Sequence, residues 1–182
     1  SAFSRFEDLD LRVGLIESVC DHPNADKLMV LNVNIGRPIQ LVAGLRSFYS
    51  KEELTGKKVV VISNLAPAKL RGMESQGMVL AAEAGDQVKV LTPSGPAEPG
   101  DRVNSGMGSG TKVLTFQEFQ AFTLRTGTVL NDQEADLGRK VRADTSGLIK
   151  GRQAAFFLPN EGSEAAHPLF TERKVSIGVD GE

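Results

Sequence analysis

Several residue types that build common kinds of site are scarce in this chain of 182 residues. Its one cysteine, Cys20, cannot form an internal disulfide, so a reducing, cytoplasmic setting is expected. Two histidines and one thiol are too few for a dedicated zinc centre, and we expect no metal ligands. No apolar run approaches the roughly 20 residues that span a bilayer, and the N-terminal residues show no signal or transit pattern, so no membrane partner is expected.

Aromatic residues make up 5% of the chain and tryptophan is absent, which argues against an extended stacking platform for single strands. Groups of catalytic residues are missing as well. Cys20 and His22 are close in sequence, but no third group is placed to orient the histidine, which we interpret as a surface residue of a turn. The glycine-rich run at 106–111 lacks the lysine of a phosphate-binding loop. We therefore predict no catalytic residues and no cofactor.

The formal net charge is -2, yet one stretch contains no acidic residue. Between Leu54 and Met73 there are four cations, which are Lys57, Lys58, Lys69 and Arg71. Apolar runs at 59–62 and 78–82 flank the loop that holds the last two. We interpret this stretch as the anion-facing part of a binding surface, with an affinity for nucleic acid that is local and sensitive to salt.

Strand-like segments surround the cationic loop. The predicted strands cover residues 11–19, 28–35, 39–43, 59–62, 78–82 and 87–91, and a helical turn capped by Ser50 covers 50–54. Gly14, inside the first strand, is expected to mark a bulge or a sharp bend. This order predicts an all-β OB-fold, a five-stranded Greek-key barrel that binds oligonucleotides on one face.

A segment rich in proline, glycine and serine then divides the chain. It predicts a first domain at 1–103, a linker at 104–110 and a second domain at 111–182. The two domains share a repeat: Phe3-x-x-Phe6, within an expected short turn or helix, and Leu11-Arg12-x-Gly14 recur 113 positions later as Phe116-x-x-Phe119 and Leu124-Arg125-x-Gly127.

The second copy of the repeat is shorter and has not kept the cationic loop. Ser75-x-Gly77 is echoed by Ser176-x-Gly178 at a shift of only 101 positions, and Glu161, Glu164 and Glu172 appear in the intervening segment. We therefore expect a degenerate OB-like domain that packs on the first as a pseudo-dimer and keeps the chain monomeric.

Motifs between Phe6 and Val103 together resemble one known family. They are LDLRVGLI, H-P-x-A-D-K-L, V-x-G-L, N-L-x-P-x-K-x-R-G-x-x-S-x-G-M and P-G-D, in that order. The set is similar to the OB-type tRNA-binding domain of stand-alone tRNA-binding proteins, of many methionyl-tRNA synthetases at their C-terminus, and of the precursor of endothelial monocyte-activating polypeptide II. The second domain resembles the extra domain of the last group, which substitutes for a dimer partner.

The resemblance implies that the chain binds tRNA by its folded shape rather than its sequence. The positions that match the binding motif are Lys27, Asn64, Lys69, Arg71, Ser75 and Met78. Lys69 and Arg71 are expected to contact phosphates, which position RNA without reading its sequence. Lys27 has the same interpretation, although Asp26 beside it also fits an ordinary surface pair.

The other matched residues also have structural interpretations. Asn64 either donates to a phosphate or ribose hydroxyl or bonds local backbone. Ser75 either contacts the ligand or stabilises a turn, and Met78 is expected to pack rather than to touch a base. The loop at 44–50 adds Arg46 and Phe48 to the predicted tRNA-binding residues, and either Phe48 or its neighbour Tyr49 is expected to stack on a base or to anchor the loop.

The function predicted from these residues is non-catalytic tRNA binding, with tRNA and an aminoacyl-tRNA synthetase of the methionyl type as partners. The chain acts either as a stand-alone factor or as a synthetase appendage. Two alternatives stay open. A peptide-binding chaperone of the export type needs an apolar groove instead of the cations, and a synthetase dimerisation module needs little affinity for tRNA.

Overall fold

The structure, a computed structural model, describes residues 8–104, 113–120, 123–131, 134–135, 139–140, 153–158 and 167–181. Strands dominate these ranges, and two short helices accompany them, α2 (Lys51–Leu54) and α3 (Phe116–Gln120). Helix α2 begins with the expected cap, because Ser50 Oγ accepts the backbone N–H of Glu53 at 3.0 Å. The expected turn at Phe3 and Phe6 lies outside the described residues.

Strand β1 (Leu11–Asp21) is the centre of the largest sheet, which has seven strands among the described residues. The other members are β2 (Met29–Asn34), β3 (Pro38–Ala43), β4 (Lys58–Ile62), β7 (Met78–Val79), β10 (Arg102–Asn104) and β16 (Phe170–Thr171). One edge of β1 pairs first with β10 and then, from Leu15 onward, with β2. The other edge pairs with β4. All of these pairs are antiparallel.

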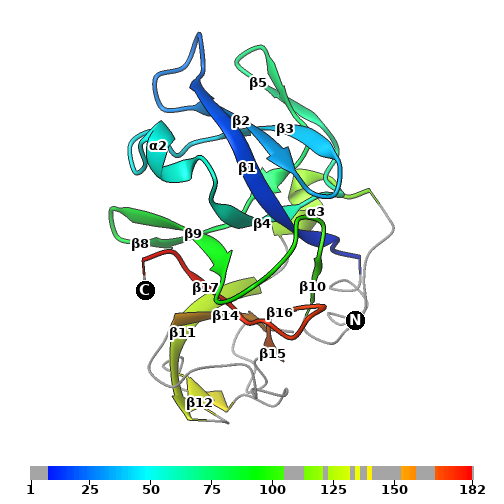
Figure 1. Ribbon diagram of the computed structural model, residues 1–182, viewed down its shortest axis with the longest axis vertical. Helices are drawn as coiled ribbons and strands as arrows, with labels where there is room; N and C mark the ends of the chain where they lie inside the picture. Colours follow the sequence, from blue (N-terminus) through cyan, green and yellow to red (C-terminus); the bar gives the residue numbers. More distant parts are fainter. Residues whose placement is uncertain are drawn as a thin grey trace.

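Smaller sheets contain the remaining strands. Strands β17 (Ile177–Val179), β9 (Gln87–Pro93) and β8 (Ala81–Ala84) pair in that order, and β5 (Ala68–Leu70) pairs with β6 (Met73–Ser75). The fourth sheet has the order β13 (Arg139–Lys140), β12 (Glu134–Ala135), β11 (Thr123–Asn131), β14 (Gln153–Leu158) and β15 (His167–Pro168). Figure 1 shows β1, β2, β3 and β5 in the upper part of the molecule and β11, β12 and β14 in the lower part.

Strands β1 and β4 lie between two hydrophobic cores, which explains why residues 59–62 form an uninterrupted apolar run. Val59 and Val61 pack in a core with the inner faces of β2 and β3. Val60 and Ile62 point to the opposite side, into a core that also contains Leu169 of the C-terminal segment. A strand covered on one face only would have alternated apolar and polar residues.

The expectation of a bulge at Gly14 is wrong by two residues. Gly14 pairs regularly with Val59, and the register shift of β1 against β2 lies between Ile16 and Ser18. Gly14 is required for a different reason. A Cβ at this position would lie 2.6 Å from Cγ1 of Val33 and 3.0 Å from Cγ2 of Val61, so glycine leaves the room that these two core side chains occupy against β1.

The single strand predicted at 78–82 is in fact two strands, β7 and β8, separated by Leu80. The backbone N–H of Leu80 donates to Val60 O at 2.9 Å, and its carbonyl accepts the N–H of Leu91 at 3.0 Å. Leu80 thus ties β4 to β9 where the chain passes from one sheet to the next. The preceding loop also contains structure that the sequence did not indicate, the β5–β6 hairpin (residues 68–75).

The seven-stranded sheet does not close into a barrel by strand pairing; instead, single hydrogen bonds join β3 to the segment before β7. Gln76 N–H donates to Gln40 O at 2.8 Å, and Gln40 N–H donates to the side-chain Oε1 of Gln76 at 2.7 Å. Ser75 Oγ accepts the N–H of Val42 at 2.9 Å. These bonds satisfy backbone groups that continuous pairing would otherwise have satisfied.

The described strands of the second half repeat a detail of the first. The register of β11 against β12 shifts between Val129 and Asn131. These positions follow Ile16 and Ser18, where β1 shifts against β2, by the same 113 residues as the sequence repeat. Shared backbone irregularity supports the interpretation that the two halves have one strand framework.

The C-terminal segment (residues 167–181) joins the first half directly. Strand β16 pairs with β10 and β17 pairs with β9, while Leu169 and Ile177 are fully buried in the core beside β1 and β4. Strand β10 ends at Asn104, within the predicted linker. The predicted division at 103/111 and the pseudo-dimer stay predictions, but the first half shares one of its two cores with residues beyond 111.

Two ion pairs also connect the C-terminal segment to the first half. The Asp180 carboxylate accepts from Lys57 Nζ at 2.8 Å and from the Tyr49 hydroxyl at 2.9 Å. Arg173 Nε donates to Asp101 at 2.8 Å. Burial raises the pKa of Tyr49 to about 12, so its hydroxyl stays protonated as a donor. None of these pairings was predicted from the sequence.

Candidate nucleic-acid interface

The β1–β2 turn (residues 22–28) carries Lys27, whose side chain is exposed as expected. His22, at the start of the turn, is only 4% exposed, so its interpretation as a surface histidine is wrong. The backbone N–H of His22 donates to Leu28 O at 3.1 Å, and that of Leu28 donates to Ala25 O at 3.2 Å. These bonds fix the path of the turn that presents Lys27.

The β5–β6 hairpin carries Lys69 and Arg71, and both side chains are exposed. Arg71 has φ 54 and Gly72 has φ 92, so both central residues of the two-residue turn are left-handed. This is the backbone of a type I′ turn, which matches the twist of paired strands but normally has Asn or Asp before the glycine. The left-handed conformation holds Arg71 at the tip of the hairpin.

Hydrogen bonds bring the β1–β2 turn against the β5–β6 hairpin, although the two are 47 residues apart in sequence. Arg71 Nη2 donates to Asn24 O at 3.2 Å, and His22 Nε2 lies 2.8 Å from Leu70 O. Both segments lie at the top of Figure 1. The folded chain therefore carries Lys27, Lys69 and Arg71 on one part of the molecule.

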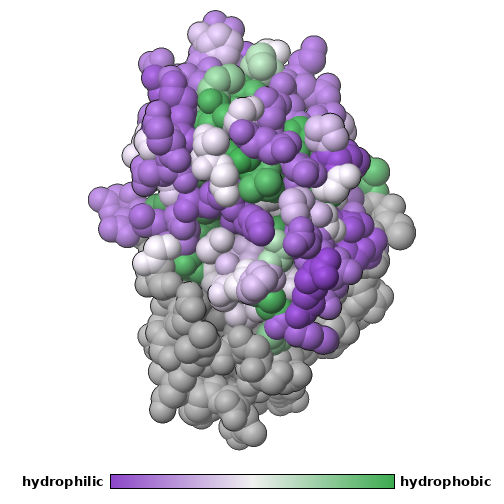
Figure 2. All heavy atoms as spheres, in the orientation of Figure 1, coloured by the Kyte–Doolittle hydropathy of each residue, from purple (hydrophilic) through white to green (hydrophobic). Residues whose placement is uncertain are grey.

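Arg46, from the loop at 44–50, contacts the same turn. Its Nη1 donates to Asp26 O at 3.1 Å, and its Nη2 lies 3.4 Å from the carboxylate of Asp21. We call Lys27, Arg46, Lys69 and Arg71 the cation surface. It is not free of acids, because Glu74 lies opposite Lys69 in the register of the hairpin strands. Figure 2 shows a largely hydrophilic upper part of the molecule, interrupted by small apolar patches.

The two neighbouring aromatic residues of the 44–50 loop have different environments. Tyr49 is 5% exposed and anchors the loop, since its hydroxyl accepts the N–H of Val90 at 3.0 Å and donates to Asp180. Phe48 is 38% exposed. Of the two side chains, Phe48 is therefore the one placed to stack on a base, and this role stays a prediction.

Three motif residues lie away from the cation surface or are engaged internally. Asn64 Oδ1 accepts the N–H of Asp10 at 3.0 Å, and Asn64 Nδ2 donates to Asp8 O at 2.5 Å, which favours the structural interpretation. Ser75 is 5% exposed, and its hydroxyl donates to Gly77 O at 2.9 Å while it accepts the N–H of Val42 in β3. Met78 is half-buried against the core, in agreement with packing.

Two of the four cations in the acid-free stretch are engaged with other parts of the fold. Lys57 is paired with Asp180, and Lys58 Nζ donates to Ala97 O at 2.5 Å. The stretch therefore does not act as one anion-facing unit. Half of its charge is engaged in contacts with the C-terminal segment and with the backbone of Ala97. Sequence position alone did not distinguish these lysines from Lys69 and Arg71.

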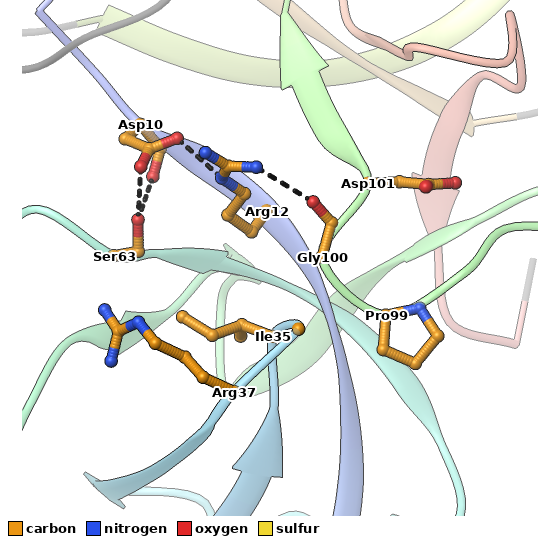
Figure 3. A pocket seen from close by; sticks show the side chains of 9 residues that line it. Asp10, Arg12, Ile35, Arg37, Ser63, Pro99, Gly100 and Asp101 are labelled. Atoms are coloured by element: carbon orange, nitrogen blue, oxygen red, sulfur yellow. Dashed lines mark hydrogen bonds and ion pairs between the residues drawn. The ribbon is translucent and has the colours of Figure 1, made fainter.

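An open cavity of about 420 Å³ lies at the opposite end of β2 from the β1–β2 turn. Figure 3 shows Arg12 pointing toward Asp10 and Gly100, with Ser63 bonded to Asp10. Arg12 Nε donates to Asp10 at 2.8 Å and Nη1 donates to Gly100 O at 3.0 Å. Because Asp10 and Asp101 also line the cavity, its charge is balanced, and it suits a phosphate backbone less well than the cation surface does.

Among the described residues, no cluster of three or more His, Cys, Asp or Glu side chains is arranged to hold a metal ion. Within the same part of the chain, no helix is both long and apolar enough to cross a membrane.

Comparison with known proteins identifies the first half. The family described as "Putative tRNA binding domain" matches residues 11–102. Methionine--tRNA ligase of Thermococcus onnurineus is 54% identical over 102 residues, which are 56% of this chain and 14% of the ligase. The chain thus corresponds to only a small part of that relative's length.

Solved structures show the same fold. The C-terminal domain of Plasmodium vivax p43 is 23% identical, with a TM-score of 0.66 over 97% of this chain and 95% of that one. The CsaA chaperone of Picrophilus torridus is 36% identical, with a TM-score of 0.52 over 55% of this chain and 95% of its own. The all-β, OB-type fold class predicted from the sequence is confirmed, with sheets that strand pairing leaves open.

Proposed function

Because this chain belongs to the family of tRNA-binding domains, we propose that it binds folded tRNA without catalysing a reaction, largely independently of sequence. In this proposal Lys27, Arg46, Lys69 and Arg71 contact phosphates on the outside of the RNA. The observation that carries it is the hydrogen-bonded docking of the β1–β2 turn on the β5–β6 hairpin, which gathers cations from distant parts of the chain. Phosphate contacts fix the position of RNA and carry no base information.

Shape recognition suits the small number of exposed aromatic residues near this surface. A-form RNA displays ribose hydroxyls and phosphates in a wide minor groove, which side chains contact without reading the sequence. Phe48 adds at most one stacking contact beside Arg46. We therefore expect different tRNAs to bind with similar affinity, and a single-stranded RNA of equal length to bind more weakly.

A gel shift across a salt series tests the proposal. Affinity should fall linearly with the logarithm of salt concentration, with a slope of about -0.9 for each phosphate neutralised on a duplex. Replacing Lys69 and Arg71 together should weaken all tRNAs about equally and make the slope shallower by about 2, one for each cation removed. Binding that ignores both salt and these substitutions would rule the proposal out.

The partners and setting follow from the same proposal. The likeness to a part of Methionine--tRNA ligase supports a role beside a synthetase of that type, either as a stand-alone factor or as an appendage, in cytoplasmic protein synthesis. The contacts of β16 and β17 with β10 and β9 support a monomer closed by its own second half. A dimerisation module would instead show twice the chain mass in solution and little affinity for tRNA.

The likeness to a chaperone favours a second candidate function, peptide binding. Leu70 is 39% exposed and Phe48 is 38% exposed, so the cation surface has apolar neighbours that an extended peptide can contact. Competition separates the two functions. An unfolded peptide that displaces tRNA at similar molar concentration, and binds equally well at high salt, would favour the chaperone role over the RNA role.

A further inference from the structure

His22 contacts two of the three segments that carry the cation surface, its own β1–β2 turn and the β5–β6 hairpin. Its Nδ1 accepts the backbone N–H of Asn24 at 2.9 Å, so this nitrogen carries no proton. In the neutral ring the proton is then on Nε2, which donates to Leu70 O at 2.8 Å. One ring therefore accepts a hydrogen bond within the β1–β2 turn and donates one to the β5–β6 hairpin.

These two bonds belong to a network of hydrogen bonds between the turn and the hairpin. The peptide groups of Asn24 use both their N–H and their carbonyl in it, since the N–H donates to His22 and the carbonyl accepts from Arg71 Nη2 at 3.2 Å. Leu70, which accepts from His22, is bonded covalently to Arg71. The network thus fixes the hairpin tip relative to the turn at two adjacent residues, Leu70 and Arg71.

Strand β6 is joined to β3, because Gln40 Nε2 donates to Glu74 O at 2.8 Å and Ser75 Oγ accepts the N–H of Val42. The tip of the hairpin lies beyond these bonds, its strands have three residues each, and a two-stranded hairpin by itself is at best marginally stable. Arg71 occupies the left-handed region, which residues other than glycine, asparagine and aspartate rarely adopt. The bond from His22 is partly buried, whereas the bond from Arg71 to Asn24 is exposed to solvent. The histidine bond is therefore less weakened by water.

We propose that His22 is a positioning residue for the tRNA-binding surface. It holds the β5–β6 hairpin against the β1–β2 turn, so that Lys27, Lys69 and Arg71 are already arranged before RNA arrives. Its effect on affinity comes from avoiding the entropy cost of ordering the hairpin on binding. The proposal rests on the proposed function for its RNA readout, while the anchoring itself can be measured without RNA.

A matched pair of substitutions separates the two hydrogen bonds of the His22 side chain, the one to Leu70 O and the one from the N–H of Asn24. His22→Gln places an amide N–H close to the position of Nε2 and keeps a donor for Leu70 O. His22→Asn keeps an acceptor close to the position of Nδ1, and with it the turn, but its amide is too short to reach Leu70. Neither amide carries a charge, and an imidazole whose Nδ1 accepts a hydrogen bond carries none either, so both variants leave the charge of the surface unchanged.

We expect His22→Asn to bind tRNA about 5- to 10-fold more weakly than the unmodified chain, and His22→Gln to stay within about twofold of it. The salt slope should be the same in all three proteins, because no cation is removed. Amide hydrogen exchange, measured without RNA, should be about 10-fold faster at residues 68–75 in His22→Asn only. His22→Ser, another short acceptor, replaces His22→Asn if the latter fails to fold.

The outcomes are distinguishable. Equal affinity and equal exchange in both variants would overturn the proposal, as would fast exchange in His22→Asn with undiminished affinity for tRNA. Equal losses in both variants would show that the bond to Leu70 O is not responsible, which also overturns it. If the unmodified chain shows no salt-dependent tRNA binding, the proposed function fails and the positioning role fails with it, even if the exchange data confirm the anchor.

Discussion

The two halves of the chain share a strand framework and differ in what it carries. Gly14 of β1 lies opposite Val59 of β4, and its repeat partner Gly127 of β11 lies opposite Ala154 of β14. The first half adds a hairpin with two exposed cations, whereas the second half has Glu161 and Glu164 in its sequence after β14. A bulge and a glycine are therefore found at corresponding positions of the two halves, while the loop residues differ.

The largest expected effect comes from removing the second half, residues 105–182. The first half then loses Leu114, Leu169 and Ile177, each at most 2% exposed. Burial of one such side chain contributes about 1.5–3 kcal/mol, so the loss is about 5 kcal/mol or more. Urea unfolding and the mass in solution measure the result, and we expect unfolding or self-association through the exposed core face.

Ile177→Ala is the milder version of the same experiment. A buried Ile→Ala change costs about 2–5 kcal/mol through lost contacts and the cavity left behind. If the shortened chain is instead a stable monomer with an unchanged free energy of unfolding, the second half is a separate domain and the first half does not depend on it for its core.

Removing the two cations of the β5–β6 hairpin should weaken tRNA binding by roughly tenfold to a hundredfold at low salt. The double variant Lys69→Ala, Arg71→Asn is suitable, because asparagine is favoured at this position of a type I′ turn and leaves the hairpin intact. The matched control is Arg37→Ala, which removes an exposed cation at the far end of β2, about 20 Å away at the rise per residue of a strand. An equal loss in the control would mean that general charge, and not this surface, attracts the RNA.

The two ion pairs between the C-terminal segment and the first half, Asp180 with Lys57 and Arg173 with Asp101, should weaken in acid. Burial acts to raise the pKa of Asp180, but hydrogen bonds from Lys57 and Tyr49 outweigh it and hold the pKa below its ordinary value of 3.8. Salt-bridged Asp101 is shifted in the same direction, since its bonds to Arg173 and the Glu98 backbone outweigh burial. A lowered folded pKa means that both contributions are complete at neutral pH and are lost as the pH falls through and below about 4.

Asp180→Asn isolates one of these contributions. We expect a loss of about 1–3 kcal/mol in the free energy of unfolding at pH 7, typical for hydrogen bonds to a charged group. The decline in stability between pH 5 and pH 2 should also become shallower than in the unmodified chain. Tyr49→Phe, which removes one donor and leaves the carboxylate, is the control. If Asp180→Asn leaves the dependence of the free energy of unfolding on pH unchanged, Asp180 does not contribute to the loss of stability in acid.

The smallest expected effect is that of Asn64→Ala on tRNA binding. Its amide bonds the backbone of Asp8 and Asp10, so the substitution should cost about 1–2 kcal/mol of stability. Affinity for tRNA should change by less than about twofold, within the range of surface effects. A large loss of affinity with unchanged stability would instead support the direct RNA contact that the motif implies.

Much of the strand order was predictable, because a strand buried on one face alternates apolar and polar residues and a strand buried on both faces is apolar throughout. The runs at 28–35, 39–43 and 59–62 all became strands, and the Ser50 cap formed as its residue types predict. The break at Leu80 was not predictable, since it depends on backbone bonds to two other strands. The hairpin at 68–75 was missed because its strands are too short and too exposed to show a period.

The candidate site was predictable in its residue types and not in its geometry. Spacing within the motif indicated Lys69 and Arg71 as exposed cations, but it left the roles of Asn64 and Ser75 open between ligand contact and structure. The structure shows that the polar groups of both are bonded internally. His22 was misinterpreted because a polar residue beside a proline usually lies on the surface. Its burial depends on a carbonyl 48 residues away.

The sequence alone determined the fold class, the repeat and the family, because these follow from local periodicity and from residue types at fixed spacing. Only the tertiary structure decided which cations are exposed beside the β1–β2 turn and which are engaged in contacts within the fold. Lys57 and Lys69 belong to one acid-free stretch, yet the first is paired with Asp180 and the second is exposed on the hairpin. The difference arises because a charge is stabilised by whichever partner the folded chain places near it, and that partner is distant in the sequence.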